Sequence, residues 1–247
     1  MSLEIGLLLP DVLGTYGDNG NALVLKRRAE MRGIPATIHE VKLGDPVPLG
    51  FDVYLMGGGE DTAQTLAVEH LAPLVNLRAP LLAICAGLQV LGESFRANGR
   101  VVDGVGLIDA TTTTLKKRAI GEIRTRPTGV PGLTDTLTGF ENHMGATLLG
   151  QDASPLGTVL MGVGNSDSSG TYDMADPSAQ LSAEGAVQGN VIATYLHGPV
   201  LARNPQLADV LLARATGQDL ADLAPLDLPE VAQLRKERLA TKRVERF

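Results

Sequence analysis

The sequence predicts an α/β protein with a doubly wound, mostly parallel sheet flanked by helices and an antiparallel extension in the middle of the chain. Short, continuous apolar runs alternate with segments of helical periodicity in the first third of the sequence, and this alternation returns near its end. Continuous apolar runs are typical of parallel strands that are buried on both faces. Between the two regions, glycines, threonines and short strand-like runs dominate. Strand–helix alternation favours a parallel sheet with functional loops at the carboxyl ends of its strands.

The first elements follow from apolar runs that turn residues interrupt. Residues 3–9 are continuously apolar and predict a buried strand, whereas residues 22–31 carry apolar side chains at helical spacing. Residues 35–41 alternate between apolar and polar side chains, and this pattern predicts the next strand. Residues 51–56 predict a further strand that three glycines terminate, and residues 61–78 predict a long amphipathic helix.

The next part of the chain changes character after one more strand. The apolar residues 80–84 predict a strand that leads directly to Cys85. Residues 101–170 lack a long helical pattern and predict hairpins or an antiparallel extension of the sheet.

The C-terminal part returns to the α/β pattern. Residues 190–196 predict a strand, and two helices follow at about 205–216 and 229–243. We therefore predict one domain over residues 1–217, with residues 218–247 as a helical extension of that domain.

The composition excludes several classes of protein. The chain of 247 residues is 44% hydrophobic, and no stretch approaches the roughly 18–20 apolar residues that cross a bilayer. The N-terminal residues lack the basic region of a secretion signal, and a single cysteine excludes an internal disulfide. We therefore expect a cytoplasmic protein. The net charge of −7 and the aromatic content of 3% give no general attraction to nucleic acid.

Cys85 is the only cysteine, and its surroundings favour a nucleophile. An apolar strand ends at this residue, and residues 86–92 follow in a helix-forming pattern. A strand–turn–helix arrangement exposes the sulfur at the rim of a sheet, where the first free helical N–H groups stabilise a thiolate. The alternative is that the cysteine is a small core residue.

Three features fall at predicted strand ends: a turn of three glycines, Cys85 and His197. The carboxyl ends of parallel strands meet at one edge of a sheet, so these features can converge there. A cysteine–histidine pair supplies a nucleophile together with a proton acceptor and donor. Acyl transfer also needs N–H donors for the oxyanion, and one from Gly58 or Gly59 with one from Ala86 would form that hole.

Each feature also has a structural interpretation. Three glycines after a strand are most often a turn or a phosphate cradle, but no Gly-Lys-Ser or Gly-Lys-Thr follows, which excludes a nucleotide P-loop here. His197 could be a structural histidine at a strand end, and His143 is ambiguous. No pair of His, Cys or carboxylate residues has a recognised metal-ligand spacing, so we expect no metal.

Residues 85–92, Cys-Ala-Gly-Leu-Gln-Val-Leu-Gly, resemble the nucleophile motif of class I, triad-type glutamine amidotransferases. Within that superfamily the chain is similar to the cobyric acid synthase-like branch, and more closely to the GatD-type glutaminase subunits of lipid II isoglutaminyl synthases. The further segments that carry this resemblance are residues 16–21, 56–61, 106–109, 118–122, 139–145 and 195–199.

The resemblance implies that Cys85 is the nucleophile and His197 the general acid and base. It also implies that Arg118 holds the substrate glutamine, where a planar fork of donors suits the α-carboxylate. Most class I amidotransferases carry a glutamate two residues after the histidine to orient its imidazole, but Pro199 stands there, a departure that the cobyric acid synthase-like branch shares. Glu141 or an aspartate brought in by folding could orient His197 instead.

The resemblance further implies a glutaminase that forms a cysteine thioester and delivers ammonia to a second subunit. No nucleotide motif is present, so we expect no cofactor in this chain and place ATP and Mg on the partner. By resemblance, that partner is a Mur ligase-like subunit, MurT, in a heterodimer. The joint reaction would amidate D-glutamate of the lipid II stem peptide in bacterial peptidoglycan synthesis, near the inner membrane face.

Three alternatives stay open at this point. One keeps the chemistry and changes the acceptor, as in the glutaminase subunit of a cobyric acid-type amidase. Another is a non-catalytic scaffold on a decayed amidotransferase fold, which the absent glutamate favours. A cysteine peptidase is disfavoured, because the cysteine motif and the segment around Arg118 match glutamine enzymes.

Overall fold

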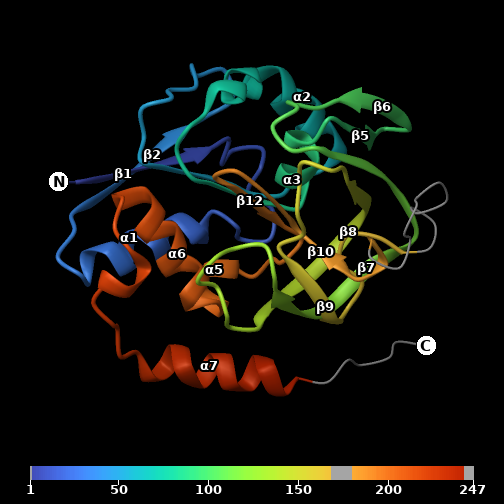
Figure 1. The fold of residues 1–247 in the computed structure, drawn as a ribbon. Helices are drawn as coiled ribbons and strands as arrows, with labels where there is room; N and C mark the ends of the chain where they lie inside the picture. Colours follow the sequence, from blue (N-terminus) through green and yellow to red (C-terminus); the bar gives the residue numbers. More distant parts are fainter. Residues whose placement is uncertain (1, 168–179, 242–247) are drawn as a thin grey trace.

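A central sheet of six strands organises the fold in the computed structural model, which describes residues 2–167 and 180–241 (Figure 1). The strand order is β11-β12-β4-β3-β1-β2, and every neighbouring pair is parallel except β11 with β12. This confirms the predicted doubly wound, mostly parallel sheet. The strands are β1 (Leu3–Leu8), β2 (Ala36–Val41), β3 (Val53–Met56), β4 (Leu81–Ile84), β11 (Ala186–Gln188) and β12 (Val191–Thr194).

Helices connect these strands close to the predicted positions. The predicted helix over residues 61–78 is shorter than expected, because α2 ends at Leu71 and the chain tightens into a 3-10 turn. Pro73 explains this break, since its ring removes a backbone donor that a continuing α-helix would use. The helices are α1 (Gly20–Glu30), α2 (Asp61–Leu71), α3 (Ala86–Leu91), α5 (Val200–Arg203), α6 (Pro205–Thr216) and α7 (Pro229–Ala240), with 3-10 turns at Ala72–Asn76 and Leu220–Asp222.

The hydrophobic core lies along the middle of this sheet. Every residue of β3, β4 and β12 is buried, which explains why their sequences are apolar without alternation. The buried rings of Tyr54, Tyr195 and Phe95 are the largest side chains of the core. The residues that follow the carboxyl ends of these strands therefore emerge from a fully packed core.

The middle of the chain is antiparallel, as predicted, but it forms a second sheet of its own. Its order is β10-β9-β7-β5-β6, with β8 paired to β7. All of these pairs are antiparallel except β5 with β7. The strands are β5 (Ser94–Ala97), β6 (Arg100–Asp103), β7 (Ala110–Pro127), β8 (Leu137–Leu149), β9 (Gly157–Met161) and β10 (Ala183–Glu184). β7 and β8 are 18 and 13 residues long and pair as a hairpin. Most backbone N–H and C=O groups of this hairpin therefore find hydrogen-bond partners within it.

The second sheet meets the first just beyond the end of β12. The Phe140 N–H donates to the His197 carbonyl at 3.1 Å, and the His197 N–H donates to the Phe140 carbonyl at 2.9 Å. The pairing of β7 with β8 shifts register between Thr114 and Ala119, so Arg118 lies in an irregular stretch of β7. Irregularities of this kind change the direction in which side chains point. Here β7 and β8 form a wall beside the sheet edge at which His197 lies.

The C-terminal helix lies along the outside of the molecule (Figure 1). No residue of α7 is buried, and the Arg235 guanidinium anchors it by donating to the Thr136 carbonyl at 2.8 Å. The division into residues 1–217 and 218–247 stays a prediction. None of the helices within residues 2–167 and 180–241 combines the length and apolar character that a bilayer-crossing segment requires.

Candidate active site

Three adjacent strands bring the predicted site residues to one edge of the central sheet. β4 lies between β3 and β12, with Ala83 opposite Met56 and Ile84 opposite Thr194. The glycine turn follows β3, Cys85 follows β4, and His197 lies three residues beyond the end of β12. Parallel strands end side by side, so the predicted convergence of these features occurs.

Cys85 occupies a sharp turn between β4 and α3. Its backbone has φ 53° and ψ −104°, a conformation that residues other than glycine rarely adopt. The Cys85 N–H donates to the Thr194 carbonyl at 2.8 Å, which ties the turn to β12. The next residue, Ala86, is the first of α3, so its N–H has no acceptor within the helix. The side chain is 7% exposed, at the floor of a pocket.

Asp18 orients the imidazole of His197. The His197 Nδ1 lies 2.9 Å and 3.1 Å from the two Asp18 carboxylate oxygens, and both side chains are buried. A carboxylate only accepts hydrogen bonds, so Nδ1 carries a proton and Nε2 is left for chemistry. The sequence left open that folding could bring an aspartate to His197, but it did not single out Asp18, because an aspartate before a helix is typical of a cap.

Glu141, the other candidate to orient His197, does not do so. Its carboxylate accepts hydrogen bonds from the backbone N–H groups of Val163 and Gly164, at 2.9 to 3.1 Å. The hydrogen bonds of this carboxylate therefore go to the loop that follows β9. Glu141 supports the second sheet rather than His197.

The environment of His197 favours the charged imidazolium. Burial lowers the pKa of His197, but the hydrogen bond to Asp18 and the neighbouring Cys85 sulfur outweigh it, and the pKa rises from 6.5 to about 10. The buried Nε2 has no well-aligned hydrogen bond to a described residue. A charged imidazole beside a sulfur is the arrangement that stabilises a thiolate.

The glycine turn packs closely against both reactive side chains. A Cβ on Gly58 would lie 3.1 Å from His197 Cε1 and 3.2 Å from Cys85 Cβ, so only glycine fits without displacing them. The Gly58 N–H donates to Asp18 at 3.1 Å, which corrects its predicted role in the oxyanion hole, because that donor is already occupied. Gly59 lines the pocket, and with Ala86 it is the remaining pair of predicted donors.

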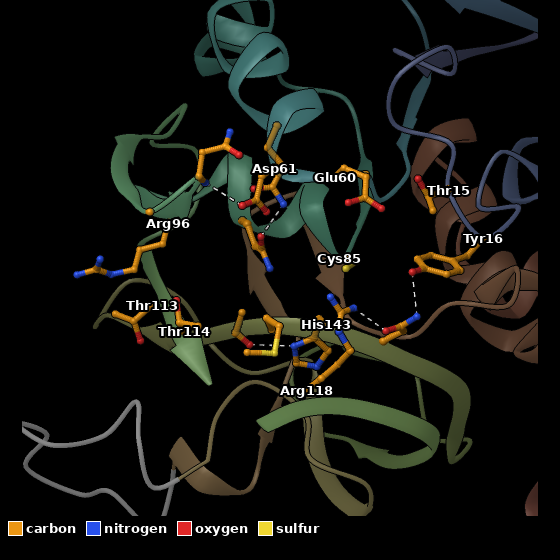
Figure 2. Close-up of a pocket in the computed structure, with 18 residues that line it drawn as sticks. Thr15, Tyr16, Glu60, Asp61, Cys85, Arg96, Thr113, Thr114, Arg118 and His143 are labelled. Carbon is orange, nitrogen blue, oxygen red and sulfur yellow. Dashed lines mark hydrogen bonds between the residues drawn. The ribbon is translucent and has the colours of Figure 1, made fainter. Parts of the chain in front are cut away.

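A pocket of about 400 Å³ opens above Cys85. Arg118 reaches it from β7, and the structure brings it together with Cys85 as expected. Figure 2 shows the side chains that line this pocket. They are Thr15, Tyr16, Gly59, Glu60, Asp61, Gln64, Cys85, Gln89, Arg96, Asn98, Gly99, Thr113, Thr114, Arg118, Asn142, His143, Met144 and Gly145.

A chain of contacts connects Arg118 to His197 across the pocket wall. Arg118 Nη1 donates to Asn142 Oδ1 at 2.8 Å, and Asn142 Nδ2 donates to the Tyr16 hydroxyl at 2.9 Å. The Tyr16 ring lies edge-on to the His197 ring, with centroids 4.9 Å apart. Tyr16 also has a positive φ of 63°. Arg118 and His197 are thus parts of one contact network.

In the wall of the pocket, a buried polar network stabilises the helix that follows Cys85. Gln64 donates to Gln89 Oε1 at 2.8 Å, and Gln89 donates to the Tyr195 hydroxyl at 3.1 Å. His143 stacks on the Tyr195 ring with centroids 3.7 Å apart, which gives this histidine a packing role. Among the residues described, no group of His, Cys, Asp and Glu could hold a metal ion.

Comparison with known proteins gives the family. Residues 4–205 match the CobB/CobQ-like glutamine amidotransferase domain. The chain belongs to this family. The amidotransferase is also 34% identical, over 88% of its length and 84% of the relative's, to the GatD subunit of lipid II isoglutaminyl synthase (glutamine-hydrolyzing) from Streptococcus pneumoniae.

Two further proteins resemble this chain, one in part of its sequence and one in its fold. The amidotransferase is 27% identical to cobyric acid synthase from Sphingopyxis alaskensis, over 69% of its own length but only 33% of that protein. The crystal structure of a glutamine amidotransferase from Thermotoga maritima superimposes with a TM-score of 0.53 at 14% identity, covering 96% of this chain and 94% of that one. This structural likeness shows a shared fold.

Proposed function

We propose that this amidotransferase is the glutaminase subunit of a two-subunit enzyme and that it hydrolyses L-glutamine at Cys85. The observation that carries the proposal is the position of His197, which contacts Asp18 on one side and lies beside Cys85 on the other. A thiolate next to an oriented imidazolium is a nucleophile with its own proton donor. The pocket above it also holds Arg118, a suitable partner for an α-carboxylate.

In the first half of the reaction, the Cys85 thiolate attacks the side-chain amide carbon of glutamine. A carbon–sulfur bond forms, and the N–H groups of Gly59 and Ala86 donate to the resulting oxyanion. His197 gives its Nε2 proton to the amide nitrogen, the carbon–nitrogen bond breaks, and ammonia leaves. The product on the enzyme is a γ-glutamyl thioester.

In the second half, water resolves the thioester. Neutral His197 removes a proton from the attacking water, the carbon–sulfur bond breaks, and the γ-carboxylic acid that is formed loses its proton to solvent as glutamate leaves. This restores the thiolate and the imidazolium. Asp18 stays ionised throughout and stabilises the charged form of His197, the role that a glutamate two residues after the histidine has in most class I enzymes.

We assign the ammonia to a Mur ligase-like partner, MurT, in a heterodimer. ATP and Mg would bind to that partner, which would activate the α-carboxyl of D-glutamate in the lipid II stem peptide for amidation. The relative from Streptococcus pneumoniae is named as a subunit, and the match extends over 84% of it. The match to cobyric acid synthase covers only 33% of that larger protein, so the two-subunit arrangement is better supported than a cobyric acid-type amidase.

The test is an assay of glutamate release and of lipid II amidation, with and without the Mur ligase-like protein. We expect both activities in the complex and neither in a complex that carries Cys85→Ala. Ammonium salts at alkaline pH should restore amidation, but not glutamate release, to the Cys85→Ala complex. Near-normal glutamate release by Cys85→Ala would disprove the mechanism. Amidation that proceeds without this subunit and without ammonium would disprove the assigned role.

A further inference from the structure

The pocket carries charges of both signs around Cys85. Its charged lining residues are Glu60, Asp61, Arg96 and Arg118. Free glutamine is a zwitterion, with an ammonium and a carboxylate on one carbon atom. A pocket that selects the free amino acid needs an acceptor for the ammonium as well as a donor for the carboxylate, since an ammonium only donates.

Glu60 is the acidic group that is available for such a ligand. The neighbouring Asp61 accepts the backbone N–H of Asn98 at 2.8 Å. The Glu60 carboxylate has neither a hydrogen bond nor an ion pair to any residue in the described part of the chain. Glu60 is exposed, with the extended backbone of a residue that immediately precedes α2. Its carboxylate is therefore free to bind a ligand cation.

Glu60 and Arg118 come from opposite walls of the pocket. Glu60 follows the glycine turn at the end of β3, and Arg118 lies in the irregular stretch of β7. In the view of Figure 2, the Glu60 carboxylate lies on one side of Cys85 and Arg118 on the other. An amino-acid head group placed between these walls would meet an anion and a cation, with its side-chain amide directed at the sulfur.

We propose that Glu60 binds the α-ammonium of the substrate while Arg118 binds the α-carboxylate. The inference rests on the proposed glutaminase function and adds the basis of its substrate selection. A site built to bind a polar group rejects an analogue that lacks it, because the site's own polar group is then left without a partner. The pair selects a free α-amino acid over other side-chain amides. Gly59 and Glu60, consecutive in the chain, serve the oxyanion and the ammonium respectively.

The test compares glutamine with glutaramate, which is glutamine without its α-amino group. We expect Glu60→Gln to lower kcat/KM for glutamine by about 10- to 100-fold, chiefly through KM, and to leave kcat/KM for glutaramate unchanged. The matched control is Glu69→Gln, an exposed glutamate on α2 outside the pocket, which should change neither value. Equal losses on both substrates, or no loss on either, would overturn the assignment.

Binding gives a second readout that does not depend on turnover. In the Cys85→Ala background, calorimetry should show that Glu60→Gln weakens glutamine binding by about 10-fold or more and leaves glutaramate binding unchanged. Unaltered glutamine binding would overturn the role of Glu60 even if hydrolysis is normal. Failure of the wild-type complex to hydrolyse glutamine would instead overturn the proposed function, and the binding result would still decide the role of Glu60.

Discussion

Asp18 and His197 are 179 positions apart in the sequence, and an Asp18 carboxylate oxygen lies 2.9 Å from His197 Nδ1. The same carboxylate accepts the Gly58 N–H at 3.1 Å. Asp18 therefore links the loop after β1, the turn after β3 and His197, three residues beyond the end of β12. A single buried acid both orients the imidazole and fixes the glycine turn beside Cys85.

Asp18→Asn tests this relationship with almost no change in volume. The amide lacks the negative charge that stabilises imidazolium, so we expect kcat for glutamine hydrolysis to fall by about 10²-fold or more, with a smaller change in KM. Asp11→Asn is the matched control, because Asp11 lies on the same loop and its exposed carboxylate accepts, among the residues described, only the Leu43 N–H. Equal activity of the two variants would show that Asp18 does not serve His197.

The raised pKa of His197 makes the stability of the protein depend on pH. The pKa rises from 6.5 to about 10 on folding, so the folded chain keeps a proton that the unfolded chain has lost. This contribution is complete below the unfolded pKa and disappears as pH rises through the folded pKa. The free energy of unfolding should thus decline between these two values more steeply in the wild type than in His197→Gln. Urea unfolding at several pH values measures this difference, and parallel curves would contradict it.

Gly58→Ala probes the close packing between the glycine turn and the reactive pair. The added methyl would lie 3.1 Å from His197 Cε1 and 3.2 Å from Cys85 Cβ, closer than ordinary contact. We expect glutaminase activity to fall about 10-fold or more, because small displacements of reacting groups slow catalysis strongly. Gly50→Ala, where the methyl meets open space, should be neutral. Comparable activity of the two variants would contradict the packing described for the site.

Cys85 stores backbone strain that glycine should relieve. Its φ of 53° disfavours any residue with a Cβ, at a cost of about 1–3 kcal/mol. Cys85→Gly should therefore unfold at a urea concentration equal to or higher than Cys85→Ala. At Ala83, in the regular strand β4, Ala83→Gly should instead be destabilising by about 1 kcal/mol. A lower unfolding midpoint for Cys85→Gly than for Cys85→Ala would mean that the turn carries no strain.

The sheet and the reactive pair could be predicted because their signals are local. Apolar runs at residues 3–9, 51–56 and 80–84 correspond to β1, β3 and β4, and the residues that follow parallel strands meet at one edge. Asp18 carried no such signal, since an aspartate before a helix is typical of a cap. Its partner lies beyond the second sheet in sequence, and no spacing rule connects the two.

Glu141 and Asn142 are neighbours on β8 but have different partners, and this explains why Glu141 was the wrong acid to consider. Asn142 lines the pocket and binds Arg118, whereas Glu141 binds the backbone at Val163 and Gly164. Which of the two faces inward depends on the register of β8 against β7, and register is a property of the folded sheet. Arg118 itself was identified only through the family resemblance.

Covalent trapping of Cys85 is the sharpest test that this residue is a thiolate nucleophile in a glutamine site. The diazoketone analogue of L-glutamine alkylates a thiolate only where a glutamine site presents it, and intact-mass measurement with peptide mapping locates the adduct. We expect one adduct per chain, on Cys85, that glutamine suppresses and that Asp18→Asn forms more slowly. A folded chain that gains no adduct, or gains one that glutamine does not suppress, would contradict this role of Cys85.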